Sequence, residues 1–441
     1  MRNKKPNFRV KHPYQNLINS IFMGLVLLLS SILSVFLIKP DRISNVQGAT
    51  YYTSSWSTVK SRMASSSNTV RLSGNITIPA SELTGATLRW YGKLYGNGYE
   101  LRIGASGTTG LNIVLYSGAL IYNVKFNIYW GVTSTSNDNA FFERVSSGAT
   151  IQNCEIHYDS VNSYPCIRSN QGTIKNCRVT GTAFPQFKSS YNDWGGICYT
   201  NSGTITQCIN EANVSSGYRK ETKDVYTGGL VGTNSGTVSQ CINDGNISGM
   251  SGVSDYKRGG HAAGIVGYST GGTISDCYNL GNITGGSARA ASADNYGDAG
   301  GSAAGICVYA SSTTVRNCFN LGTITGGPGG TGGNCTTVSS GGSGGSAGSA
   351  EWGWPHWNKR WGRAGRGGYG GYGGYGGGQG GSAGATLIFA TSSTSKSGLY
   401  GFTDVKSGRG GTGGVGAGGG GGGGGGGSSR GDAVGTGGSE G

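Results

Sequence analysis

The chain has 441 residues, of which 89 are glycine, and only 12% of its residues are charged. The length alone would allow two or three ordinary globular domains, but this composition argues against them. The formal net charge is +14. Residues 1–48 hold seven bases and one acid, so the rest carries 34 − 7 bases against 20 − 1 acids, or +8.

Residues 1–48 have the pattern of an export signal. Five basic residues and no acid precede the uncharged run "IFMGLVLLLSSILSVFLI", which ends at Ile38. Val46 and Gly48 are small enough for signal peptidase, which would make Ala49 the first residue of the mature chain. The run is also just long enough to span a membrane, so an uncleaved N-terminal anchor is the alternative.

An exported chain with a mild positive charge suits an anionic cell wall or surface polymer. We therefore expect a secreted or cell-surface location and no nucleic-acid partner. Contact with the membrane is expected only through the N-terminal segment, if that segment stays uncleaved.

A sequence repeat runs through residues 119–327. Its clearest copies are "GGICYTNSGTITQCINEANVSSG" from Gly195, "GGLVGTNSGTVSQCINDGNISG" from Gly228, "AGIVGYSTGGTISDCYNLGNITGG" from Ala263 and "AGICVYASSTTVRNCFNLGTITGG" from Ala304. Fainter copies begin at Ala119, Ala149 and Cys166. A fixed period of this kind is typical of a stacked array and not of separate domains.

Each copy has roughly 23 residues of short alternating segments with glycine or asparagine at the joints. We therefore predict an all-β fold, a single right-handed parallel β-helix. Residues 49–118 would form an N-terminal cap and the first coils, with a short amphipathic helix within residues 51–66 covering the end of the stack.

The repeat resembles the GLUG motif repeats of bacterial secreted and cell-surface proteins. The residues that carry the resemblance are Gly229, Leu230, Val231, Gly232, Asn234, Gly236, Cys241 and Gly245. It covers residues 195–327 well and residues 119–194 weakly. The resemblance implies a surface β-helix and no particular reaction.

Stacking of the copies predicts two ladders of side chains. The first holds Cys154, Cys177, Cys208, Cys241, Cys277 and Cys318, with Val124 at the same position upstream. We expect these to be inward-pointing reduced thiols, because parallel ladders point side chains the same way; a disulfide framework is the alternative. The second ladder holds Asn210, Asn243, Asn279 and Asn320, which we expect to be structural. Cys335 fits neither ladder.

Insertions of growing length separate the copies, at residues 218–227, 250–262, 287–303 and 328–382. All leave the coil at the same corner, so they should lie along one edge. Residues 383–407 would form a last degenerate coil, and residues 408–441, with Gly418–Gly427 unbroken, a polyglycine tail. Disorder is the default for such composition, but glycine strands along one edge could also pack into an extended three-fold array.

The insertion at 328–382 holds the best candidate for a ligand site. Its aromatic faces could stack on sugar rings, and its arginines could pair with acidic groups of a polysaccharide. The alternative is that the tryptophans pack onto the β-helix. The candidate residues are Trp352, Trp354, Trp357, Trp361, Arg360, Arg363, Arg366, Tyr369, Tyr372 and Tyr375.

Groups for catalysis are sparse. Glu155, His157 and Asp159 should share one strand face, where they could bind a metal or transfer protons, although a solvated face is the simpler interpretation. His261 and His356 lie in loops without evident partners. We therefore expect no catalytic residue, metal or cofactor, and a protein that is not an enzyme.

These patterns favour an exported bacterial surface protein acting in adhesion or as a structural component of the cell surface. Its partner would be a cell-wall or extracellular polysaccharide, or the protein itself. The first alternative is a self-assembling filament subunit that uses β-helix stacking and glycine-rich edges. The second is a carbohydrate-active β-helix lyase or hydrolase.

Overall fold

A computed structural model describes residues 48–104, 111–129, 140–159, 166–183, 193–215, 224–252, 258–291, 296–332, 379–402, 404–412 and 428–429. The chain divides into two compact units, Met1–Val46 and Gln47–Gly441. All the described residues belong to the second unit, and the fold below is the fold of that unit.

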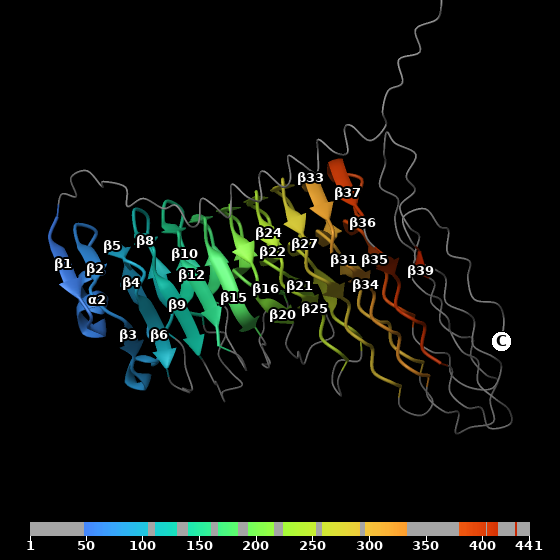
Figure 1. Cartoon of the computed structure of the whole chain (residues 1–441), viewed down its shortest axis with the longest axis horizontal. Helices are drawn as coiled ribbons and strands as arrows, with labels where there is room; N and C mark the ends of the chain where they lie inside the picture. Colours follow the sequence, from blue (N-terminus) through green and yellow to red (C-terminus); the bar gives the residue numbers. More distant parts are fainter. Residues whose placement is uncertain are drawn as a thin grey trace, which may run out of the picture. The chain divides into compact units, whose positions relative to one another are not determined.

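Each coil of the central repeat consists of five short strands. In one coil these are β16 (Trp194–Gly195), β17 (Cys198–Asn201), β18 (Thr204–Thr206), β19 (Ile209–Asn210) and β20 (Asn213–Ser215). Each strand pairs in parallel with its counterpart in the next coil, one repeat further along the chain. Figure 1 shows the coils side by side in chain order, from blue to red.

Two groups of strands form two separate parallel sheets, called the nine-stranded and the five-stranded ladder below. The nine-stranded ladder contains β4 (Leu88–Trp90), β7 (Ile113–Leu115), β10 (Phe142–Val145), β13 (Ile167–Asn170), β17, β22 (Val231–Asn234), β27 (Val266–Ser269), β32 (Cys307–Ala310) and β36 (Leu387–Ala390). The five-stranded ladder contains β16, β21 (Tyr226–Gly228), β26 (His261–Ala263), β31 (Ala303–Ala304) and β35 (Ala383–Gly384).

The remaining strands form one 25-stranded sheet with three segments. The first segment contains β1 (Thr50–Thr53), β2 (Thr69–Leu72), β5 (Lys93–Tyr95), β8 (Leu120–Tyr122), β11 (Thr150–Gln152), β14 (Thr173–Lys175), β18, β23 (Thr237–Ser239), β28 (Thr273–Ser275), β33 (Thr314–Asn320) and β37 (Ser395–Gly401). The second contains β3 (Ile76–Ile78), β6 (Glu100–Gly104), β9 (Lys125–Tyr129), β12 (Glu155–Tyr158), β15 (Arg178–Ala183), β19, β24 (Ile242–Asn243) and β29 (Tyr278–Asn279), and continues in β33 and β37. The third contains β20, β25 (Ile247–Ser248), β30 (Ile283–Thr284), β34 (Ile324–Thr325), β38 (Val405–Lys406) and β39 (Ser428–Ser429).

A left-handed residue bends the chain between the first and second segments. Gln207, Gln240 and Asp276 have φ of 56°, 53° and 55°, and each comes directly before a ladder cysteine. In other coils asparagine takes this position with the same left-handed φ, as at Asn153 and Asn176. Residues without a branch at Cβ tolerate this conformation better than β-branched ones. The bend separates two strands without a long loop, which keeps every coil in the same register.

The core is a column of inward-pointing aliphatic side chains. Ile174, Ile205, Val238 and Ile274 lie in one register of the first segment and are fully buried. In β18 and β23, alternation along the strand turns threonine and serine outward on either side of Ile205 and Val238. At roughly 25 cal/mol per Å² of apolar surface, this column is the main source of stability.

A helix covers the N-terminal end of the stack, as the sequence predicted. It is α2 (Trp56–Arg62), and it buries Trp56 and Val59. The Trp56 ring lies 6.0 Å from that of Trp90. A single 3₁₀ turn, η1 (Ala80–Glu82), follows β3.

The fold expected from the sequence is confirmed: the unit is a parallel β-helix. The one antiparallel pair among the described residues joins β38 and β39. No helix within the described ranges is long and apolar enough to cross a membrane. The apolar run at 21–38, like the rest of the expected export signal, lies outside those ranges.

Candidate functional site

The six ladder cysteines lie in one register of the second segment: five come directly before its strands, and Cys318 lies within β33. Their position holds Val124 in an earlier coil and Leu399 in the last one. All are buried and unbonded, as are Cys166, Cys198 and Cys307. Each ladder thiol donates to a backbone carbonyl two residues earlier; for Cys241 this is the carbonyl of Ser239, at 3.1 Å.

Burial raises the pKa of the Cys198 and Cys307 thiols well above that of a free cysteine, because a thiolate would lose its hydration there. The same cause raises the pKa of Cys208 and Cys277. Protonated, buried thiols are poor nucleophiles. All six ladder cysteines are buried and unbonded, so they fill the core as small apolar side chains. Cys335 lies outside the described residues.

The predicted asparagines form a continuous hydrogen-bonded ladder. Asn210 Nδ2 donates to Asn243 Oδ1 at 2.7 Å, and the same bond links Asn243 to Asn279 at 2.7 Å and Asn279 to Asn320 at 2.6 Å. Each amide also donates to a carbonyl two residues later, such as that of Gly245 at 2.8 Å. These side chains have no exposed surface, so their role is to join the coils.

A second asparagine ladder was not predicted. Asn170 donates to Asn201 at 2.7 Å, and Asn201 donates to Asn234 at 2.8 Å. All three lie at the ends of strands in the nine-stranded ladder. The sequence signal for this ladder was the pattern N-x-G-T, which these three copies share. Ser269 and Ala310 take the place of the asparagine in the later copies.

The described parts of the insertions form extended arms at the corner after β25, β30, β34 and β38. Gly285 and Ala288 donate backbone bonds to Thr325 and Pro328 of the next arm, at 2.8 and 2.9 Å. Gly326 and Gly329 donate in the same way to the carbonyls of Lys406 and Arg409, in the arm that begins at β38. A bond at every third residue matches the three-residue turn of a polyproline II helix.

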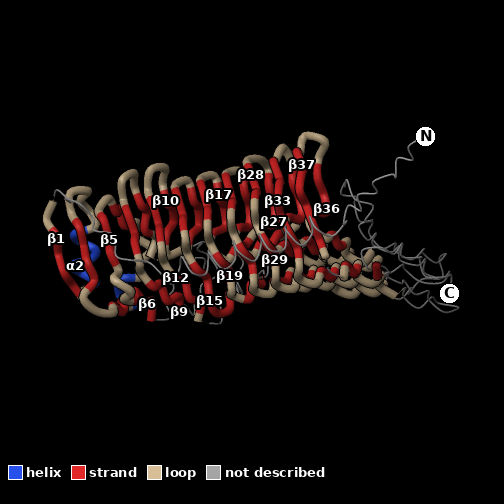
Figure 2. Tube along the Cα trace, turned by 45° about the horizontal axis from the view of Figure 1, so that its top comes forward, coloured by secondary structure: helices blue, strands red, loops and turns tan. Residues whose placement is uncertain are grey.

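The returning chains lie against these outgoing arms and complete the array. Gly301 donates to Gly286, Gly327 donates to Gly301, and Gly381 donates to Gly327, at 2.7–2.8 Å. Figure 2 shows the arms in tan, gathered at the lower right of the view, and in Figure 1 they run side by side from yellow to red. The three-fold glycine array considered from the sequence is the arrangement of the described arms.

Close approach explains the glycines of the arms. A Cβ atom at Gly286 would overlap the carbonyl oxygen of Met250, and one at Gly301 would overlap that of Gly260. These neighbours are backbone atoms and cannot rotate away. Glycine is therefore required inside the array, as it is at the crowded axis of a collagen triple helix.

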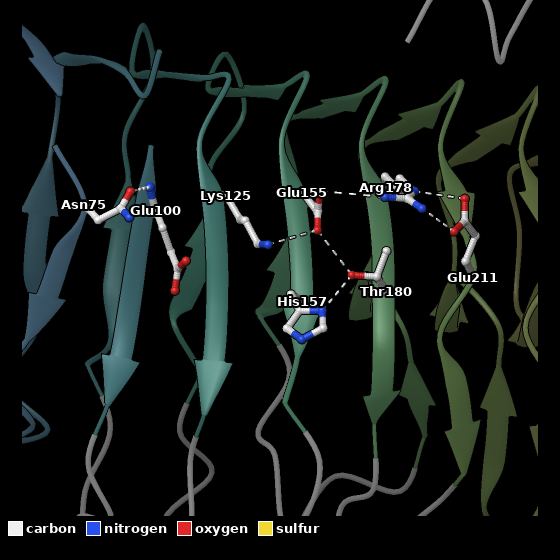
Figure 3. Close-up of polar contacts among 8 residues, drawn as sticks. All are labelled: Asn75, Glu100, Lys125, Glu155, His157, Arg178, Thr180 and Glu211. Carbon is white, nitrogen blue, oxygen red and sulfur yellow. Dashed lines mark hydrogen bonds and ion pairs between the residues drawn. The ribbon is translucent and has the colours of Figure 1, made fainter. Parts of the chain in front are cut away.

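The outer face of the second segment, formed by β9, β12, β15, β19, β24, β29, β33 and β37, is called the ladder face below. Its N-terminal half is a row of alternating charges (Figure 3). Glu155 lies 3.6 Å from Lys125 and 3.8 Å from Arg178. Arg178 makes a bidentate pair with Glu211, whose shorter bond is 2.6 Å.

His157 and Asp159 lie on this same face. His157 Nδ1 is 2.8 Å from Thr180 Oγ1, and Asp159 lies 4.0 Å from Arg102. The carboxylates of this group thus face basic side chains on an open sheet, an arrangement that links neighbouring coils. Across the described ranges, no three His, Cys, Asp or Glu side chains are placed to hold a metal ion.

The C-terminal half of the ladder face is aromatic. The row that contains Lys125, Glu155 and Arg178 continues through two isoleucines to Tyr278, Phe319 and Tyr400. The Tyr278 and Phe319 rings stack at 5.3 Å, and the Phe319 and Tyr400 rings at 4.8 Å. One row of the β-helix therefore changes from charged to apolar along its length.

The aromatic row ends in two parallel, stacked rings on the last coil. The Tyr400 and Phe402 rings are 6.3 Å apart with only 5° between their planes. Their exposures are 43% and 44%. This pair, called the ring platform below, is a half-exposed aromatic pair that the sequence analysis missed, because the last coil departs most from the repeat.

His261 lies at the corner where the arms return. Its ring stacks on Tyr226 at 4.8 Å, its Nδ1 accepts a bond from the Ser302 amide at 2.9 Å, and its Nε2 is 4.0 Å from Asp224. Burial lowers the pKa of His261 to about 4, with Arg258 acting in the same direction and Asp224 against it. A loop histidine that lacked evident partners in the sequence is thus part of a packed corner.

The predicted ligand residues of the 328–382 insertion all fall outside the described residues, as does His356. Comparisons with family models, with curated proteins and with solved structures find no match to this chain. The resemblance to GLUG repeats stays a prediction.

Proposed function

We propose that this chain is an exported bacterial surface protein that adheres to extracellular polysaccharide or forms part of the cell surface. The observation that carries the proposal is the ring platform. Two parallel, half-exposed aromatic rings end the stacked row, and an exposed aromatic face is a surface on which the apolar face of a pyranose ring can pack. Fixed on a β-helix, they would meet such a ligand without an ordering cost.

Two further features support a binding role. The charges on the other half of the ladder face are paired with one another, which leaves the platform as its main apolar contact surface. The Trp- and Arg-rich insertion, which holds residues 352–366, enters and leaves the array next to the last coil. It would add a second contact surface of similar chemistry.

The test is cosedimentation of the purified protein with insoluble cell-wall polysaccharides. A variant with Tyr400→Ala and Phe402→Ala should bind at least about tenfold more weakly, the equivalent of 1.4 kcal/mol. A second variant replaces Trp352, Trp354, Trp357 and Trp361 with alanine and is expected to weaken binding as well.

The matched control carries Tyr52→Ala and Tyr99→Ala, two exposed tyrosines in the N-terminal coils with 72% and 38% exposure. It should bind like the wild type. If the protein binds no polysaccharide, or if both aromatic variants bind as well as the control, adhesion through these surfaces is wrong.

Assembly into filaments is a second candidate. On the last coil, β36 and β37 are the final strands of their ladders among the described residues, and Phe389 within β36 is 43% exposed. Apolar strand edges of this kind favour pairing with another chain. Electron microscopy of the purified protein would support assembly if it finds filaments, whereas single short particles at all concentrations would contradict it.

A further inference from the structure

The outer face of the first segment, called the hydroxyl face below, carries an unbroken row of threonines. Through six successive coils, one outward position pairs threonine with threonine. Parallel pairing places these side chains about 4.8 Å apart along one line. This threonine row consists of Thr150, Thr173, Thr204, Thr237, Thr273 and Thr314.

The hydroxyls of the threonine row are available to a ligand. All six side chains are partly exposed, and none of their hydroxyls makes a hydrogen bond to another described residue. In the neighbouring row of the same face, by contrast, the Ser239 hydroxyl donates to that of Thr206 at 3.0 Å. Because a hydroxyl is both donor and acceptor, the threonine row offers one free bonding group per coil.

Charge distinguishes the hydroxyl face from the ladder face. Lys93 lies two coils before the threonine row in the same register, and Lys175 and Arg316 lie in the neighbouring row. Among the described residues no ion pair involves these three bases. On the ladder face, Glu155 and Glu211 both pair with bases of neighbouring coils. The bases of the hydroxyl face are thus free to bind an external anion.

The hydroxyl face also lacks acids. No strand of the first segment contains an acidic residue, and the structure describes all of these strands. Asp276, directly after β28, is the acid nearest to them along the chain, and it accepts a bond from Asn317 at 3.0 Å. The three free bases are spread from β5 to β33, so only an extended anion can reach all of them.

We propose that the hydroxyl face binds a linear acidic polysaccharide that lies along the threonine row. Sugars in such a chain follow one another at nearly the spacing of neighbouring coils, so each coil can offer its hydroxyl to one sugar. The free bases pair with the carboxylates of the chain. This inference rests on the proposed polysaccharide ligand, but it uses a different face from the ring platform.

The first test is isothermal titration of the purified full chain with polygalacturonate, which has one carboxylate per sugar. The triple variant Lys93→Gln, Lys175→Gln and Arg316→Gln should bind at least about tenfold more weakly, with a shallower loss of affinity as salt rises, because fewer counterions are released. The matched control removes the same charge at three exposed bases off this face and should bind like the wild type. It carries Arg89→Gln, Lys406→Gln and Arg409→Gln.

The second test asks whether the threonine hydroxyls take part. Thr204→Val and Thr237→Val together keep the side-chain size and the strand preference but remove two hydroxyls, so binding should weaken about tenfold. The control is Thr284→Val with Thr325→Val, two threonines of the third segment that pair with each other in the same way. It should leave the affinity unchanged, and circular dichroism should be native for every variant.

Two further polymers test the class of ligand. Methyl-esterified polygalacturonate keeps the sugars without the charge, and inorganic polyphosphate keeps the charge without the sugars; both should bind the wild type at least about tenfold more weakly than polygalacturonate. Equal binding of either polymer would overturn the proposal. So would absent binding of polygalacturonate, or a glutamine or valine variant that binds like its control.

The ring platform is tested separately on the same ligand. The variant with Tyr400→Ala and Phe402→Ala should keep wild-type affinity for polygalacturonate. In that case a failure of adhesion through the platform leaves the hydroxyl face standing as a binding surface. If this variant loses polygalacturonate while the glutamine and valine variants keep it, the acidic polymer binds at the platform and the present proposal is wrong.

Discussion

Buried asparagines join the central coils at the scale of single residues. Asn243 donates to Asn279 and to the Gly245 carbonyl, and accepts from Asn210. A buried amide with all these partners stabilises the stack, whereas removing it leaves buried partners without a hydrogen bond.

We expect Asn243→Ala to lower the free energy of unfolding by about 2–4 kcal/mol. It removes the bonds that one N–H of Asn210, the Asn279 Oδ1 and the Gly245 carbonyl make to this side chain. Urea denaturation followed by circular dichroism measures this. Asn246→Ala is the control: Asn246 is exposed and accepts one bond from the Asn282 amide. Equal losses in the two variants would contradict the ladder's role.

His261 should make stability depend on pH. Its pKa is about 4 in the folded chain and near 6.5 in the unfolded chain, because burial disfavours the imidazolium. Between these values the unfolded chain binds more protons, so this contribution is present above pH 6.5 and is lost as pH falls towards 4. The full loss is on the order of 3 kcal/mol.

His261→Asn tests this, because the asparagine oxygen can still accept the bond from Ser302 but does not titrate. Between pH 7 and pH 4 the unfolding free energy of the wild type should fall by more than that of the variant. Both should respond equally to other titrating groups, so a constant difference would show that His261 is not buried as a neutral ring.

The residues of the two predicted ladders could be found from the sequence because aligned copies repeat the same letter. The second asparagine ladder repeats its letter in only three copies and was missed, and the His261 corner could not be found. Ser269 and Ala310 replace the asparagine of that ladder in the later copies. The partners of His261 come from insertions on neighbouring coils, which share no common sequence pattern.

At the scale of elements, the arms are the least ordinary part of the molecule. Past β25, β30, β34 and β38 the described arms contain no strand. Backbone bonds nevertheless join neighbouring arms at every third residue. The sequence indicated that insertions lie along one edge. It could not decide between disorder and a three-fold array, because a glycine-rich composition is compatible with both.

Gly301→Ala should destabilise the arms, because its Cβ would overlap the Gly260 carbonyl and neither backbone can move freely. We expect a loss of about 2 kcal/mol or more and a lower unfolding midpoint. Gly271→Ala is the control, since the nearest atom to its Cβ would be Ser235 O at 3.9 Å. If the two variants unfold alike, close packing of the arms is wrong.

At the scale of the whole unit, the β-helix presents its surfaces in sequence order. The ladder face runs from paired charges near Glu155 to the ring platform at Tyr400 and Phe402. The repeat predicted the fold because its copies align in one register. It did not predict the platform, because aromatic residues replace Ile209 and Ile242 only in the later coils.

The central claim is that coils and glycine arms form one hydrogen-bonded structure that holds these surfaces in place. Hydrogen exchange of the purified protein, read by mass spectrometry on peptides covering residues 249–252, 285–291 and 326–332, tests it most directly. The arm amides should exchange as slowly as those of the neighbouring strands β25, β30 and β34. Complete exchange of the arms within seconds, beside protected strands, would contradict the account.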